Sequence, residues 1–176
     1  MKQILYAIAL LCCFLLLISC RKTERGSLIP ESSRYRLWEQ PIREILDYPI
    51  PGHEDNRRRI FINPEGTEVR VESRENRVYW EYPVGTIILK EIIPGLQGQD
   101  TDYPFQITAM IKAPQDPQSR GGWLWVAKAV DSGEETIVDW EFCFDCHANA
   151  NEPHPYGDGN AAGEFRDYVF FPYRKP

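Results

Sequence analysis

The chain has 176 residues, which is the length of one globular domain with a short additional segment. It carries 20 Lys and Arg against 26 Asp and Glu, a net charge of −6, and this balance argues against nucleic-acid binding. The charge is compatible with a basic redox partner, although solubility is the ordinary meaning of such a balance.

Residues 1–19 have the features of a lipoprotein signal peptide. Lys2 forms a positive start, and residues 4–19 are an apolar stretch that is short for a membrane-spanning helix. The stretch ends at Cys20 in a Leu-Ile-Ser-Cys sequence that resembles a lipobox, so Cys20 is the expected lipidation site and first mature residue. An uncleaved N-terminal anchor is the alternative. Removal of the leader leaves 19 Lys and Arg against 26 Asp and Glu, a net charge of −7.

The chain after the leader is expected to form a tether and one folded domain. Residues 20–33 are mostly polar and are expected to connect the lipid to a domain at residues 34–176. Residues 35–46 have partial helical periodicity, interrupted by Pro41, so we expect two short helices or one kinked helix there.

Most of the domain has the pattern of short strands separated by turn residues. The expected strands are residues 58–63, 68–73, 75–82, 86–93, 105–112 and 123–130. An expected helix follows at residues 139–150, then an irregular loop at 151–163 and an extended segment at 167–173. This order predicts an α+β, strand-dominant fold: an antiparallel sheet with a few helices, one of them C-terminal.

Residues 86–93 form the clearest strand, and it carries two charges among apolar residues. Lys90 shares one face with Ile88, whereas Glu91 shares the other with Leu89. Both faces are largely apolar, so the strand is expected to be covered on both sides. The ordinary interpretation is that Lys90 extends past the apolar surface and Glu91 lies at the edge of the sheet.

The most informative motif is Cys143-Phe-Asp-Cys146-His147, the pattern of covalent c-type haem attachment. On a helix the two thiols and the imidazole share one face, so each thiol can reach one vinyl group of a porphyrin. His147 is then the expected axial ligand of the iron. The sequence therefore predicts one covalent haem c, attached after export.

Two other interpretations of the motif are weaker. A thioredoxin-like redox pair needs a βαβ context, which is absent around residue 143. A zinc site could use Cys143, Cys146 and His154, but it would leave His147 without a role. The remaining cysteines are Cys12 and Cys13 in the leader and Cys20, so none is left for a structural disulfide.

Several further residues are weaker candidates for the site. Met110 could be a sixth iron ligand but is more readily explained as a packed core residue. His53 and His154 lie in polar or irregular segments and are expected at the surface. Aromatic residues expected to pack around the porphyrin and the sheet are Trp123, Trp125, Trp140, Phe142 and Phe144.

Three stretches together resemble the cytochrome P-460 and cytochrome c′-beta family. They are Tyr-Pro-Val-Gly-Thr-Ile-Ile-Leu-Lys-Glu at residues 82–91, the late Cys-x-x-Cys-His motif, and Asp-Tyr-Val-Phe at residues 167–170. Upstream, residues 58–65 resemble the first core strand and its turn in that family. The resemblance extends over residues 35–173.

The resemblance implies a dimeric, β-rich protein with a five-coordinate haem. In the enzymatic members a lysine at the position of Lys90 is linked to the porphyrin rim, and those members oxidise hydroxylamine. Members without the link bind small gases such as nitric oxide. Proton release during such an oxidation needs a base. Glu91, Asp131 and Glu141 are the candidates, with Glu91 disfavoured because it points away from the face of Lys90.

These observations predict a lipid-anchored monohaem cytochrome on the periplasmic face of a membrane. Its expected activity is oxidation of hydroxylamine or a related small nitrogen species, with Lys90 catalytic. The alternatives are a gas-binding protein without turnover and a plain electron carrier. Its expected partners are the small nitrogenous substrate or gas, a redox protein, the membrane and a second copy of the chain.

Overall fold

The computed structural model describes residues 25–95 and 102–176. The predicted leader and the lipidation site at Cys20 lie outside this range. The described chain is strand-dominant with few helices, so the predicted fold class is confirmed. None of its helices is long and apolar enough to cross a membrane.

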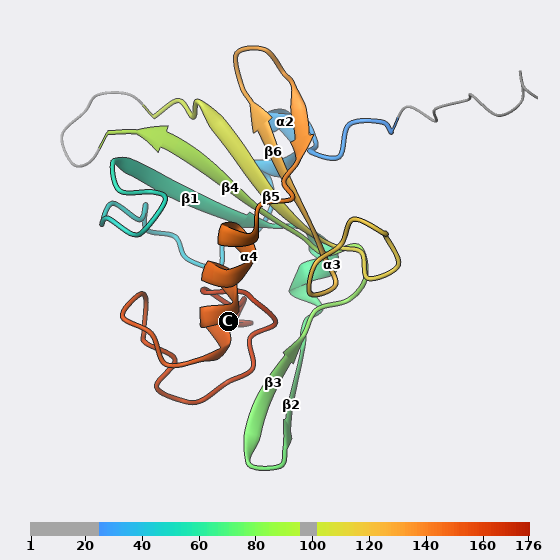
Figure 1. The fold of residues 1–176 in the computed structure, drawn as a ribbon, viewed down its shortest axis with the longest axis vertical. Coiled ribbons are helices and arrows are strands. Elements are labelled where there is room, and N and C mark those ends of the chain that lie inside the picture. Colours follow the sequence, from blue (N-terminus) through green and yellow to red (C-terminus); the bar gives the residue numbers. More distant parts are fainter. Residues whose placement is uncertain (1–24, 96–101) are drawn as a thin grey trace, which may run out of the picture.

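A five-stranded antiparallel sheet forms the body of the protein (Figure 1). Its strands, in spatial order, are β1 (Asn56–Ile62), β4 (Ile87–Pro94), β5 (Gln106–Lys112), β6 (Trp123–Ala129) and β7 (Glu135–Ile137). A separate hairpin of β2 (Arg70–Arg74) and β3 (Arg77–Glu81) projects from this body. The sequence predicted every strand except the three-residue β7, which is too short to show a pattern.

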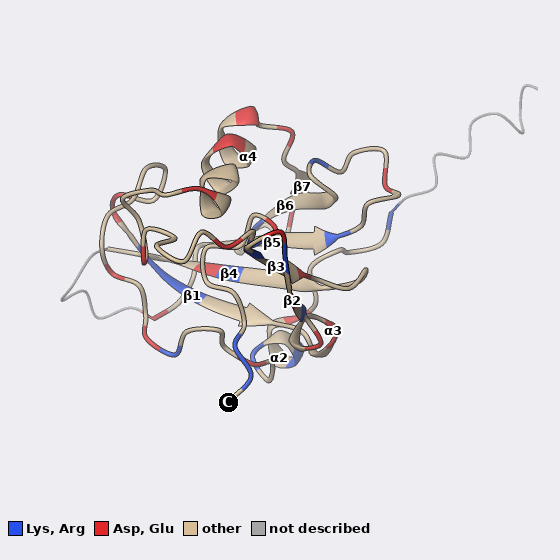
Figure 2. Ribbon diagram, turned by 90° about the horizontal axis from the view of Figure 1, so that it is seen from below, with Lys and Arg blue, Asp and Glu red and all other residues tan. Residues whose placement is uncertain are grey.

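The helices lie on both sides of the sheet. They are α2 (Ser32–Tyr35), α3 (Pro64–Thr67), α4 (Glu141–Ala148) and the 3₁₀ turn η1 (Asn149–Asn151). Figure 2 shows α4 on one side of the sheet and α2 on the other, with acidic residues along α4. The C-terminal segment after η1 returns to pack beside α4 (Figure 1).

The helical expectation for residues 35–46 is wrong beyond Tyr35. Helix α2 is a single turn that ends at Tyr35, and its N-cap is Glu31. The chain then runs beside the edge strand β1, where Glu39 bridges to Ile62 and Leu46 exchanges backbone hydrogen bonds with Arg58. The unpaired backbone groups of that edge, together with Pro41, explain why the weak helical periodicity does not decide the structure.

Each face of the sheet carries its own hydrophobic cluster, as the pattern of β4 predicted. The α2 face packs Ile29, Tyr35, Phe61, Leu89, Ile107, Ala109, Leu124 and Val126 together. The opposite face packs Ile60, Ile62, Ile88, Met110, Trp123 and Trp125 with residues of β3 and the C-terminal segment. The second cluster forms the surface against which α4 is placed.

Lys90 and Glu91 lie on opposite faces of β4, in the middle of the sheet rather than at its edge. Glu91 is fully buried on the α2 face. Its carboxylate accepts hydrogen bonds from Tyr35 Oη at 2.9 Å, Arg36 Nε at 2.8 Å and Arg59 Nη1 at 3.0 Å. Glu91 of β4 therefore holds α2 on the sheet and is also bound to the neighbouring strand β1, and its burial is stabilised by two cations and a hydroxyl.

The loop that follows α4 is ordered by a buried arginine. Arg166 is 1% exposed and holds Asp158 with two hydrogen bonds, at 2.7 and 2.8 Å, and Glu164 at 3.0 Å. The backbone of Arg166 also donates to the side chain of Asn151 at 2.6 Å. These contacts explain how a loop rich in Gly and Pro, without helical or strand periodicity, is fixed beside α4.

Candidate functional site

Helix α4 brings the three residues of the motif to one side. Cys143, Cys146 and His147 occupy positions i, i+3 and i+4, and both cysteines are free and partly accessible. The backbone N–H of Cys143 donates to the carbonyl of Trp140 at 3.0 Å, which closes the first turn. No residue of α4 is fully buried. The helix thus presents two thiols and an imidazole on one accessible surface.

The orientation of His147 is set by a backbone hydrogen bond. Its Nδ1–H donates to the carbonyl oxygen of Tyr168 at 2.9 Å. The ring also makes edge contacts with Trp125 of β6, at 4.8 Å between centroids, and with Phe170, at 5.2 Å. A proton on Nδ1 leaves the lone pair of Nε2 to bind a metal.

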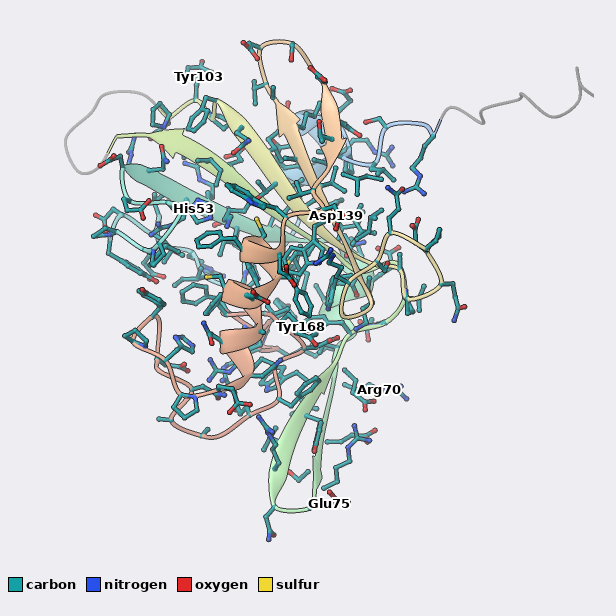
Figure 3. The ribbon with its side chains drawn as sticks, in the orientation of Figure 1. His53, Arg70, Glu75, Tyr103, Asp139 and Tyr168 are labelled. Atoms are coloured by element: carbon teal, nitrogen blue, oxygen red, sulfur yellow. The ribbon has the colours of Figure 1, made fainter. Side chains whose placement is uncertain are left out.

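Lys90 is paired with His53, which the sequence analysis had placed at the surface. Its Nζ lies 3.0 Å from Nε2 of His53, which comes from the loop before β1. The expectation that His53 lies free at the surface is wrong: it is partly buried beside the sheet, at the position labelled in Figure 3. A polar loop gives no periodic signal, so only the tertiary structure shows this pairing.

A buried arginine holds the loop of His53 in place. Arg58 is 1% exposed, donates to the carbonyl of His53 at 3.2 Å and to that of Tyr48 at 2.5 Å, and lies over the Tyr48 ring. On the other side of the loop, a Cβ placed at Gly52 would lie 3.1 Å from the Phe142 ring. The loop is therefore packed between the sheet and α4.

Burial makes the site unfavourable for positive charge. Burial, reinforced by Arg58, lowers the pKa of Lys90 to about 8, and the two cysteines oppose this shift. Burial and Lys90 lower the pKa of both His53 and His147 to about 3. The two imidazoles are therefore neutral at pH 7, and an appreciable fraction of Lys90 is a free amine.

The cysteines respond to the same environment. Burial raises the pKa of Cys143 and Cys146, and Lys90 partly opposes this effect. Lys90 is thus electrostatically coupled to both thiols and to His147. Lys90 in the middle of β4 therefore lies near enough to the motif on α4 for their charges to interact.

The low pKa of His53 predicts a pH-dependent stability that a variant can isolate. The unfolded state binds a proton near pH 6.5 and the folded state only near 3, so the free energy of unfolding falls as pH drops from 6.5 towards 3. Replacing His53 by Gln removes this contribution. Since the ring is partly accessible, we expect wild type to lose about 1 kcal/mol more than His53→Gln between pH 6.5 and 5.

Urea unfolding of both holoproteins at pH 7, 6 and 5 measures this difference. Asp158 titrates lower, since Arg166 lowers its pKa to about 2, so it contributes little in that range. If the free energy of unfolding falls equally with pH in wild type and His53→Gln, His53 is not buried as a neutral ring.

The donor set of α4 fits a c-type haem better than the alternatives. Thioether attachment and axial ligation require two accessible thiols and an imidazole with a free nitrogen lone pair. All three groups lie on a single face of α4. In the described residues, no group of three His, Cys, Asp or Glu side chains is arranged to hold a metal ion. His154 instead accepts a backbone hydrogen bond from Tyr156 and packs on Phe170.

The remaining candidates are core residues, exposed residues or residues bound elsewhere. Met110 is buried in the cluster beneath α4, as expected of a core residue. Glu91 is engaged on the opposite face, and Asp131 and Glu141 are exposed. Trp123 and Trp125 are buried, whereas Trp140 and Phe142 remain 67% and 48% exposed at the start of α4.

Comparison with known families identifies one match. The family model described as Cytochrome P460 matches residues 33–171. No curated protein matches the chain. The matched range includes the motif on α4, Lys90 and the turn that binds His147, so the geometry described above lies inside the shared part of the chain.

Proposed function

The chain belongs to the cytochrome P460 family, whose members bind haem, and we propose that it oxidises hydroxylamine or a related small nitrogen species at a five-coordinate haem c. One observation carries the proposal: two free thiols and an imidazole whose Nδ1–H is bound by the Tyr168 carbonyl lie together on one accessible face of α4. When bound, the haem supplies an iron that accepts electrons from the substrate.

The residues of α4 hold the cofactor in this proposal. Cys143 and Cys146 would form its thioethers, and His147 would bind the iron through Nε2. The carbonyl of Tyr168 retains the proton on Nδ1 of His147, which strengthens the ring as a ligand. The aromatic rings of Trp125 and Phe170 limit rotation of the imidazole.

Lys90 and His53 provide the reactive polar groups of the site. A fraction of Lys90 is the free amine, the nucleophilic form, and Lys90 is the residue that matches the rim-linked lysine of the enzymatic members that this chain resembles. His53 has a neutral ring whose Nε2 lies 3.0 Å from Lys90 Nζ, so it can accept a hydrogen bond from the amine and hold it in position.

The activity test compares two readouts on protein matured by haem-attachment machinery. An enzyme with linked Lys90 should show a strongly red-shifted ferrous absorption band and hydroxylamine-dependent reduction of an electron-accepting dye. An ordinary c-type ferrous spectrum without dye reduction would refute the proposal. Nitric oxide binding by that protein would then support a gas-binding function, whereas six-coordinate low-spin iron in both oxidation states would support an electron carrier.

We further propose export and lipid anchoring at Cys20, because haem attachment to this motif is made outside the cytoplasm and the leader ends in a lipobox-like sequence. Wild type should fractionate with membranes, and Cys20→Ser should be recovered unlipidated. A wild type that does not fractionate with membranes would contradict the anchor.

We propose homodimerisation from the family resemblance and a basic redox partner from the acidic charge. Sedimentation of the purified domain would test the dimer.

A further inference from the structure

The carbonyl that binds His147 belongs to an unusual turn. Asp167 and Tyr168 both have positive φ, of 50° and 68°, and the N–H of Val169 donates to the carbonyl of Arg166 at 3.0 Å. This is a type I′ β-turn, whose two central positions favour Asn and Gly. A tyrosine in this conformation is strained, so the surrounding structure must hold the turn.

Two residues of the sheet bind the carboxylate of Asp167, the first central residue of the turn. Asp167 Oδ2 binds Lys112 Nζ of β5 at 2.5 Å, and Oδ1 accepts from Trp123 Nε1 of β6 at 3.2 Å. The Lys112 ammonium also lies 4.9 Å from the centre of the Trp123 ring. Asp167 is 6% exposed and Trp123 is fully buried, so these charge-assisted contacts are shielded from water.

The second central residue is held by packing. The Tyr168 ring lies 5.2 Å from the Phe144 ring of α4. A Cβ placed at Gly121 would lie 2.6 Å from the Tyr168 ring, so only glycine permits this approach. Figure 3 shows Tyr168 beside α4. Both central residues of the turn are thus fixed, one to the sheet and one to the helix.

We propose that Lys112 and Trp123 are positioning residues for the axial ligand. Their hydrogen bonds to Asp167 fix the turn, and the turn places the Tyr168 carbonyl that orients His147. The inference rests on the proposed role of His147 as iron ligand. A hydrogen bond from Nδ1–H to a fixed carbonyl raises the electron donation of the imidazole and so adjusts the reduction potential of the iron. Loosening the turn weakens this bond without touching the thiols.

Resonance Raman spectroscopy of the ferrous holoprotein tests this inference through the iron–histidine stretching band. In Lys112→Met the band should move to lower frequency and broaden, and the reduction potential should rise. Lys128→Met is the matched control: Lys128 is equally shielded on β6 and pairs with Glu135 at 3.3 Å, far along the strand from the turn. It should lower thermal stability without changing the band.

Two further variants decide the remaining outcomes. Trp123→Phe removes the indole N–H bond to Asp167 and part of the ring beneath the Lys112 ammonium, so it gives a shift in the same direction even if Lys112→Met does not fold. A band unchanged in the folded Lys112 and Trp123 variants, or moved equally by Lys128→Met, would overturn the inference. Persistence of the wild-type band in His147→Ala would instead refute the proposed ligand itself.

Discussion

Replacing Cys143 and Cys146 together by alanine is expected to abolish thioether attachment of the haem completely. The two thiols are the free cysteines of the described chain, and they share the accessible face of α4 with His147. With Lys90 also replaced, no proposed covalent bond remains. Acid–acetone extraction or denaturing mass spectrometry should then recover all of the haem free of the polypeptide.

Asp145 offers a control within the same motif. It lies between the two cysteines but is exposed. Asp145→Ala should therefore retain its haem through denaturation. Haem that stays bound to the triple variant lacking both cysteines and Lys90 would show that the attachment site is elsewhere.

Replacing Lys90 by alanine is expected to remove both the red-shifted ferrous band and hydroxylamine oxidation, while the haem stays attached through its thioethers. The amine lies in the middle of the sheet, its charged form is disfavoured by burial, and it is coupled to both thiols. Loss of this group also leaves His53 without its partner at 3.0 Å. We expect the rate of hydroxylamine-dependent dye reduction to fall roughly 100-fold or more.

Lys128→Ala is the matched control for this change. Lys128 is another partly shielded lysine of the same sheet, but its Nζ binds Glu135. Its replacement should leave the spectrum and the dye reduction unchanged. An unaltered spectrum and rate in Lys90→Ala would mean that Lys90 is neither linked to the porphyrin nor catalytic.

Local patterns predicted the sheet well. Alternation in β4 placed Lys90 and Glu91 on opposite faces and required cover on both, and the two clusters confirm this. Strands β1, β5 and β6 were also marked by β-branched and aromatic runs ending at turn residues. The family resemblance, drawn from residues 82–91, the haem motif and residues 167–170, is confirmed by the family match.

The sequence failed where long-range contacts decide the structure. Residues after Tyr35 pair with the edge of β1 instead of continuing as a helix. Glu91 was expected at an edge, but Arg36 and Arg59, from two other segments, compensate its full burial. Neither contact has a signature within one window of sequence.

The site divides in the same way. The motif on α4 was visible from spacing alone, since i, i+3 and i+4 define a helical face. The contact of His53 with Lys90 and that of Asp167 with Lys112 could not be predicted, because they join residues 37 and 55 positions apart. Histidine in a polar loop and aspartate beside tyrosine have many ordinary explanations, and only the fold distinguishes among them.

The intact mass of the wild-type protein, exported and matured in a host with haem-attachment machinery, tests the central claim most directly. Under denaturing conditions we predict the mass of the mature polypeptide, with its lipid at Cys20, plus one haem. A colourless, iron-free product with the mass of the polypeptide alone would contradict the assignment of α4 as a haem-binding helix.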